Sequence, residues 1–128
     1  MADMIDATRK LASNNSKIVS TLNSFSTHEH ISKYECIFSL VEPTSELVHL
    51  REETLSHFPG ASTVIRFMPH ISLLYNELSV ELRKQICVDL ASTYPDLLKS
   101  TLVFKKIELW NTDNACDTWK CIESFDLQ

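Results

Sequence analysis

Glycine occurs only once in this chain of 128 residues, at Gly60. Loops that cradle phosphate with backbone amides need several glycines at fixed spacing, because the backbone must approach the ligand closely. A dinucleotide-binding fingerprint and a P-loop are therefore excluded. Any phosphate that this chain binds must be held by side chains or by scattered amides.

The spacing of apolar residues predicts a single α+β domain over residues 1–128, with helices packed on one sheet. Helices are predicted where apolar residues recur at helical spacing, over 3–12, 43–58 and a segment that begins after Ser79. Strands are predicted over 17–25, 34–41, 70–75, 101–110 and 118–125. The last two strands flank an Asn- and Asp-rich turn and are expected to form a hairpin.

Capping residues and polar positions refine two of these helices. Asp3 and Ser79 are expected to cap the first and the third helix by accepting hydrogen bonds from backbone amides. In the third helix Arg83 and Lys84 are predicted to face solvent. The buried stripe of that helix is predicted to consist of Leu82, Ile86 and Leu90.

The run from Pro69 to Tyr75 places a histidine and a serine two residues apart in an otherwise apolar, strand-like segment. Successive side chains of a strand alternate between its faces, so His70 and Ser72 are expected to share one face, while Tyr75 points to the other. An imidazole can give or take a proton, and a neighbouring hydroxyl can donate to a phosphate oxygen. The pair is therefore the candidate site, although most His-x-Ser pairs in strands are purely structural.

Several segments together resemble the two-histidine (2H) phosphoesterases, and among them the eukaryotic cyclic nucleotide phosphodiesterase family. The segments that carry the resemblance are Phe67-Met68-Pro69-His70-Ile71-Ser72-Leu73-Leu74-Tyr75, Tyr34-Glu35-Cys36-Ile37-Phe38, Glu42-Pro43-Thr44-Ser45-Glu46-Leu47, Ile107-Glu108-Leu109-Trp110 and Trp119-Lys120-Cys121-Ile122. The resemblance extends over about residues 5 to 126. It implies a LigT-like α+β fold of two pseudo-symmetric lobes, each of which supplies one His-x-Thr or His-x-Ser motif.

The resemblance also implies a reaction, substrates and site residues. The reaction is the hydrolytic opening of a cyclic phosphate without a metal or another cofactor. The implied substrates are nucleoside 2′,3′-cyclic phosphates and ADP-ribose 1″,2″-cyclic phosphate, a by-product of tRNA splicing. His70 would act as an acid or a base, Ser72 would hold a phosphate oxygen, and Tyr75 would contact the substrate.

The sequence departs from the family pattern at the first motif. That motif lies on a strand before the first helix in the family, and no residues for such a strand precede Asp3 here. We therefore expect an N-terminally truncated domain with an incomplete first lobe. His30-Ile31-Ser32 matches a substitute motif literally, but it falls where the strand over 34–41 is about to begin. A metal site at His28 and His30 is disfavoured, because no further ligand lies near them in the sequence.

Three functional hypotheses follow from this departure. The first is a cyclic phosphodiesterase that uses His70. The second is a catalytically inactive remnant that binds a nucleotide or a protein. The third is a dimer in which two copies of His70 and Ser72 face each other, with self-association through the sheet edge that the missing strand would leave open.

Charge and composition limit the classes of binding partner and the cellular location that we expect. The net charge of −5 argues against binding of a nucleic acid polymer and favours a small nucleotide in a local pocket. No apolar run is long enough to span a membrane, so we expect a cytoplasmic protein without membrane contact. Free thiols are expected at Cys36, Cys87, Cys116 and Cys121, although the last two could also pair across the hairpin.

Overall fold

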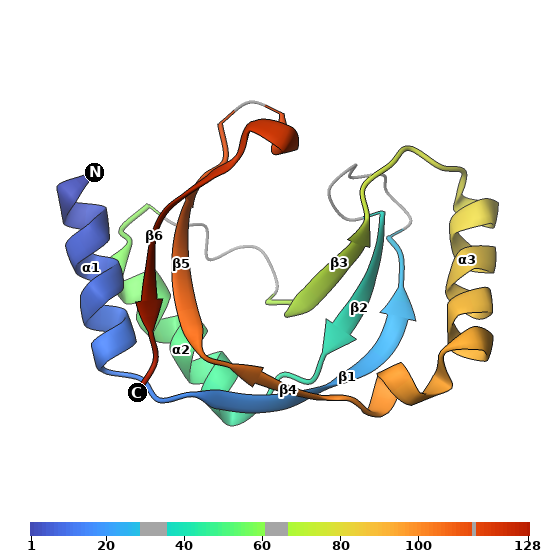
Figure 1. Ribbon diagram of the computed structural model, residues 1–128, viewed down its shortest axis with the longest axis horizontal. Helices are drawn as coiled ribbons and strands as arrows, with labels where there is room; N and C mark the ends of the chain where they lie inside the picture. Colours follow the sequence, from blue (N-terminus) through green and yellow to red (C-terminus); the bar gives the residue numbers. More distant parts are fainter. Residues whose placement is uncertain (29–35, 61–66, 114) are drawn as a thin grey trace. The chain divides into compact units, whose positions relative to one another are not determined.

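The computed structural model describes residues 1–28, 36–60, 67–113 and 115–128 (Figure 1). The chain divides into two compact units, and neither of them is a single stretch of sequence. Unit 1 consists of Met1–Ile18, Ser45–Arg66 and Val103–Gln128, and unit 2 consists of Val19–Thr44 and Phe67–Leu102. Both units contain helices and antiparallel strands, which confirms the α+β class.

Unit 1 contains two helices and a hairpin. The helices are α1 (Ala2–Ser13) and α2 (Ser45–His57), and the antiparallel strands are β5 (Lys106–Asn111) and β6 (Lys120–Asp126). A short 3-10 helix, η2 (Cys116–Thr118), precedes β6. Ala12, Phe125 and Leu127 form the core of this unit, and Ile5 and Ile107 pack against it. The predicted hairpin is thus confirmed.

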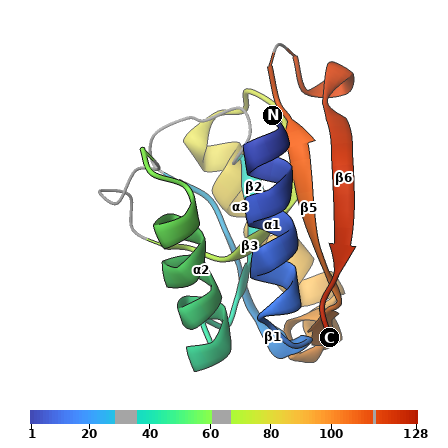
Figure 2. The same ribbon diagram turned by 90° about the vertical axis from the view of Figure 1, so that its left-hand side faces the viewer.

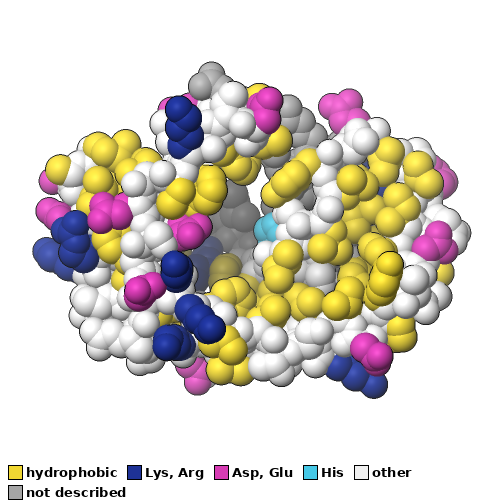
Figure 3. All heavy atoms as spheres, in the orientation of Figure 1, with side chains coloured by type: hydrophobic (Ala, Val, Ile, Leu, Met, Phe, Trp, Pro, Cys, Tyr) yellow, Lys and Arg dark blue, Asp and Glu magenta, His cyan; other side chains and the backbone are white. Residues whose placement is uncertain are grey.

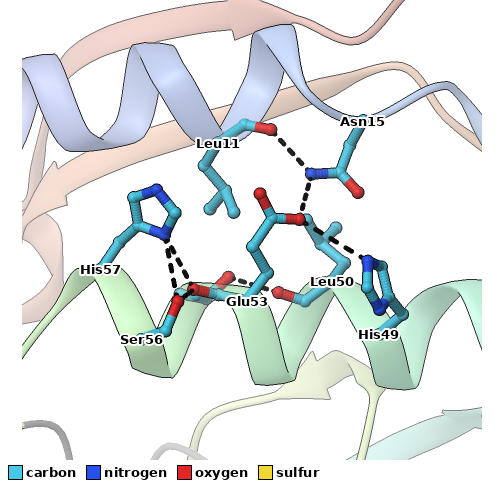
Figure 4. A network of polar contacts seen from close by, with 8 residues as sticks. Leu11, Asn15, His49, Leu50, Glu53, Ser56 and His57 are labelled. Atoms are coloured by element: carbon cyan, nitrogen blue, oxygen red, sulfur yellow. Dashed lines mark hydrogen bonds and ion pairs between the residues drawn. The ribbon is translucent and has the colours of Figure 1, made fainter.

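Polar contacts connect α1 and α2, which lie side by side in unit 1 (Figure 2). The Asn15 side-chain amide donates to the Leu11 carbonyl at 2.8 Å and to the Glu53 carboxylate at 2.9 Å (Figure 4). The same carboxylate lies 3.8 Å from the His49 imidazole. Asn15 therefore joins the C-terminal end of α1 to the middle of α2.

Unit 2 contains most of a four-stranded sheet in the order β3-β2-β1-β4. The strands are β1 (Ile18–Ser26), β2 (Ile37–Val41), β3 (His70–Leu74) and β4 (Thr101–Phe104). β2 is antiparallel to both β1 and β3, and β3 is the outermost strand of the described sheet. Helix α3 (Val80–Thr93) and the 3-10 helix η1 (Pro95–Lys99) connect β3 to β4.

Helix α3 begins as predicted, and Ile86 and Leu90 of the predicted stripe are half-buried, but Leu82 and Arg83 differ from the prediction. Ser79 Oγ accepts a hydrogen bond from the Leu82 amide at 3.2 Å, which confirms the cap. The prediction that Arg83 faces solvent was wrong, because Arg83 is 1% exposed whereas Leu82 is 47% exposed. The guanidinium of Arg83 donates to Thr27 Oγ at 2.7 Å, to the carbonyl of His28, and to the Leu78 carbonyl at 3.2 Å. These acceptors hold the arginine inside unit 2.

Three further expectations were wrong. The predicted strand over 101–110 is two strands, β4 and β5, and these belong to different sheets, so the described strands form two sheets rather than one. The break falls at Lys105, whose carbonyl accepts from the Leu127 amide at 2.8 Å. The N-cap of α1 is Met1 and not Asp3, which lies in the first helical turn.

We predict that Arg83→Met destabilises the protein by about 3 kcal/mol, because the substitution leaves the carbonyls of His28 and Leu78 without their donor. Lys84→Met, at an exposed position beside it, should change stability by less than about 0.5 kcal/mol. Urea denaturation followed by circular dichroism measures both. Equal stability of the two variants would contradict a structural role for the buried guanidinium.

Candidate functional site

Strand β3 presents His70 and Ser72 on the same face. Burial alternates along the strand, with His70 and Ser72 half-buried and with Ile71 and Leu73 more exposed, as the sequence pattern predicts. In the register of the sheet, His70 lies opposite Leu40 and Ser72 lies opposite Phe38 of β2. Paired residues of adjacent strands project from the same side of a sheet, so this face combines the polar pair with two apolar side chains.

The backbone fixes the protonation pattern of the His70 ring. Nδ1 of His70 lies 2.8 Å from the carbonyl oxygen of Met68. A carbonyl only accepts, so Nδ1 carries a proton in this hydrogen bond, and the lone pair of the neutral ring is on Nε2. His70 is therefore arranged to take a proton at Nε2 and, once charged, to return it from the same atom.

A second imidazole lies on the same side of unit 2, next to Phe38. The ring centroids of His28 and Phe38 are 5.0 Å apart, and those of Phe38 and His70 are 5.4 Å apart. The buried Phe38 ring thus contacts both histidines. From the sequence, His28 was considered only as a disfavoured metal ligand, although it follows Ser26 by two residues and so continues the alternation of β1.

Arg83 holds the backbone next to this second imidazole. Its guanidinium donates to the His28 carbonyl and to Thr27 Oγ, and Thr27 Oγ in turn donates to the Cys36 carbonyl at 2.6 Å. The two residues that follow β1 are therefore connected to the residue before β2 and to α3. Helical periodicity gave no indication of this role, because Thr27 and His28 are distant from Arg83 in the sequence.

The other sequence-predicted positions are less informative. Tyr75 follows directly after β3 and is half exposed, and its proposed contact with the substrate stays a prediction. The substitute motif His30-Ile31-Ser32 lies outside the described residues. Within the described ranges, no group of three histidine, cysteine or acidic side chains is arranged to hold a metal ion. None of the helices described is long and apolar enough to cross a membrane.

Burial changes the acidity of a thiol near Arg83. Burial raises the pKa of Cys87 above its ordinary value of 9.0, the neighbouring Cys36 raises it further, and the positive charge of Arg83 lowers it. All four cysteines of the chain are free. A pKa above 9.0 keeps the Cys87 thiol protonated at neutral pH.

The fold and the polar face define an α+β protein with one His-x-Ser pair on an antiparallel strand. No family model matches the chain. The chain is 29% identical over 97 residues to a protein of Arabidopsis thaliana named "Cyclic phosphodiesterase", a match that covers 73% of this chain and 53% of that protein. The chain thus spans about half the length of this curated relative. The similarity supports a distant relationship to a cyclic phosphodiesterase.

The acidity of Cys87 can be tested by alkylation. We predict that the rate of iodoacetamide labelling at Cys87, followed by mass spectrometry against pH, has its midpoint above 9.0. Arg83→Lys keeps the positive charge and should leave the midpoint close to that of the wild type, whereas Arg83→Met should move it upward. A midpoint at or below 9.0 in the wild type would contradict the effect of burial.

Proposed function

We propose that this chain takes part in the hydrolysis of cyclic phosphates, with His70 as a proton-transfer residue. The observation that carries the proposal is the pairing of His70 with Ser72 on one half-buried strand face, with Nδ1 of His70 held by the Met68 carbonyl. The distant similarity to a cyclic phosphodiesterase supports the same chemistry. We include in this proposal that the chain has the 2H phosphoesterase fold and uses the two-histidine mechanism of that superfamily.

The proposed reaction needs two proton transfers. Water attacks phosphorus as a base removes its proton, and the bond from phosphorus to one sugar oxygen breaks as an acid protonates that oxygen. His70 performs one of these transfers through Nε2. The Ser72 hydroxyl donates to a non-bridging phosphate oxygen, where negative charge builds up in the transition state. No cofactor is required for these steps.

The second proton-transfer group has two proposed sources. His28 is one of them, because it approaches the Phe38 ring that His70 also contacts. The other is His70 of a second copy of the chain, since β3 is the outermost strand of the described sheet and a free edge allows two chains to associate. His28→Ala and the dependence of specific activity on protein concentration distinguish these sources.

The proposed substrates are small nucleotides. They are nucleoside 2′,3′-cyclic phosphates, ADP-ribose 1″,2″-cyclic phosphate, or both, with Tyr75 as a further contact. A net charge of −5 favours these over a nucleic acid polymer. Such substrates arise in tRNA splicing, and we propose that the protein acts on them in the cytoplasm.

We predict that His70→Ala abolishes hydrolysis of 2′,3′-cyclic AMP and that Ser72→Ala lowers the rate by about 10²–10³-fold, as the loss of one donor to a developing anion does. The assay follows product formation by phosphorus NMR in the presence of EDTA. His49→Ala, at an exposed histidine of unit 1, is the matched control and should keep full activity. Activity that survives in His70→Ala would refute the proposed role of His70.

A second candidate function is a nucleotide- or protein-binding module without catalytic activity. It is favoured by the presence of one His-x-Ser pair among the described residues, His70 and Ser72, whereas the proposed reaction needs two proton-transfer groups. In this case the folded wild-type chain would bind 2′,3′-cyclic AMP saturably without turnover. His70→Ala would then weaken binding and leave the free energy of unfolding unchanged.

A further inference from the structure

The sheet of unit 2 has a second face, opposite to the one that carries His70 and Ser72. Between this face and α3 lies a cavity of about 440 Å³. Its walls include Phe25, Ile37, Ile71 and Leu73 from the strands, and Ile86 and Leu90 from α3. Figure 3 shows hydrophobic side chains gathered over this part of unit 2. Helix α3 therefore leaves an apolar space above the sheet instead of closing it.

The cavity has one polar feature that the fold does not explain. Ser39 lines it, is 1% exposed, and has no hydrogen-bond partner for its Oγ among the described residues. Its neighbours in the sheet register are Phe25 and Ile71, which offer no polar side-chain atom. A buried hydroxyl without a partner is unfavourable, and native proteins usually satisfy such groups. Among the described residues, the hydrogen-bonding capacity of the Ser39 hydroxyl is therefore unused.

The walls restrict the chemistry of an occupant. No lining residue is charged, so a ligand with an ionised group inside the cavity would lose its hydration without compensation. The volume is about three times that of an engineered cavity that binds benzene, roughly 150 Å³, and lies in the usual range of small-molecule sites. On the side where α3 meets η1, the wall includes Tyr94 and Leu97, which are both exposed. A small molecule can therefore enter there without separation of the strands.

We propose that unit 2 binds a neutral, mainly apolar small molecule that carries one hydroxyl or carbonyl group, between the sheet and α3. The apolar part of the ligand fills the space between Leu73 and Leu90. Its oxygen atom forms a hydrogen bond with the hydroxyl of Ser39. This site is separate from the face that carries His70, and it does not depend on hydrolysis of a cyclic phosphate.

The probe is 1-octanol, titrated into the full chain and measured by isothermal titration calorimetry. Saturable binding of one molecule is expected. Octanoate, which has a chain of the same length but an ionised end, should bind at least about tenfold more weakly. No saturable binding of 1-octanol, or equal binding of octanoate, would overturn the proposal.

Two substitutions locate the bound probe. Ser39→Ala removes a single oxygen atom and should weaken binding of 1-octanol about fivefold, which corresponds to one neutral hydrogen bond, without lowering the stability of the free chain. Leu90→Trp fills the cavity and should weaken binding by about tenfold or more. Val88→Trp is the matched control, because Val88 is exposed on the same helix and does not line the cavity.

The affinities of these variants for 1-octanol decide whether the proposal holds. Loss of affinity in Ser39→Ala and Leu90→Trp, with Val88→Trp like the wild type, supports it. Unchanged affinity in Ser39→Ala overturns it, even if Leu90→Trp does not fold. Circular dichroism of each variant checks folding independently of binding.

Discussion

The buried guanidinium of Arg83 organises unit 2. Among the described residues it is the one charged side chain that is buried, and its hydrogen bonds reach the end of β1 and the turn before α3. Removing a charge from water is costly unless polar groups surround it, so its acceptors must keep their positions. The His28 carbonyl is one of these acceptors. The arginine thereby fixes the backbone of His28. The imidazole of His28 contacts the Phe38 ring, which also contacts His70.

Local patterns predicted much of this fold. The alternation along β3, the Ser79 cap of α3 and the β5–β6 hairpin depend on neighbours in the sequence, and all three are present. The division of the stretch over 101–110 into β4 and β5 depends on the distant Leu127, which binds the Lys105 carbonyl. Strand propensity is continuous across that stretch. Sequence reasoning therefore could not locate the break.

In the candidate site, too, only the residues that are related by a short spacing in the sequence could be predicted. His70 and Ser72 were found because a spacing of two residues already defines a shared strand face. His28 and Arg83 were missed because their relationship depends on the pairing of β1 with β2 and on the position of α3. An arginine on a helix usually faces solvent, and only tertiary contacts reveal the exception.

The way the chain is divided between its units bears on the order of folding during synthesis. Unit 2 is complete once Leu102 has left the ribosome, whereas unit 1 needs β5 and β6 from the last part of the chain. Helices α1 and α2 are synthesised early and must wait for the hairpin that completes their core. Their apolar faces are exposed to chaperones and to other chains during that interval. Synthesis of β5 and β6 therefore ends the interval in which the apolar faces of α1 and α2 lack their partners.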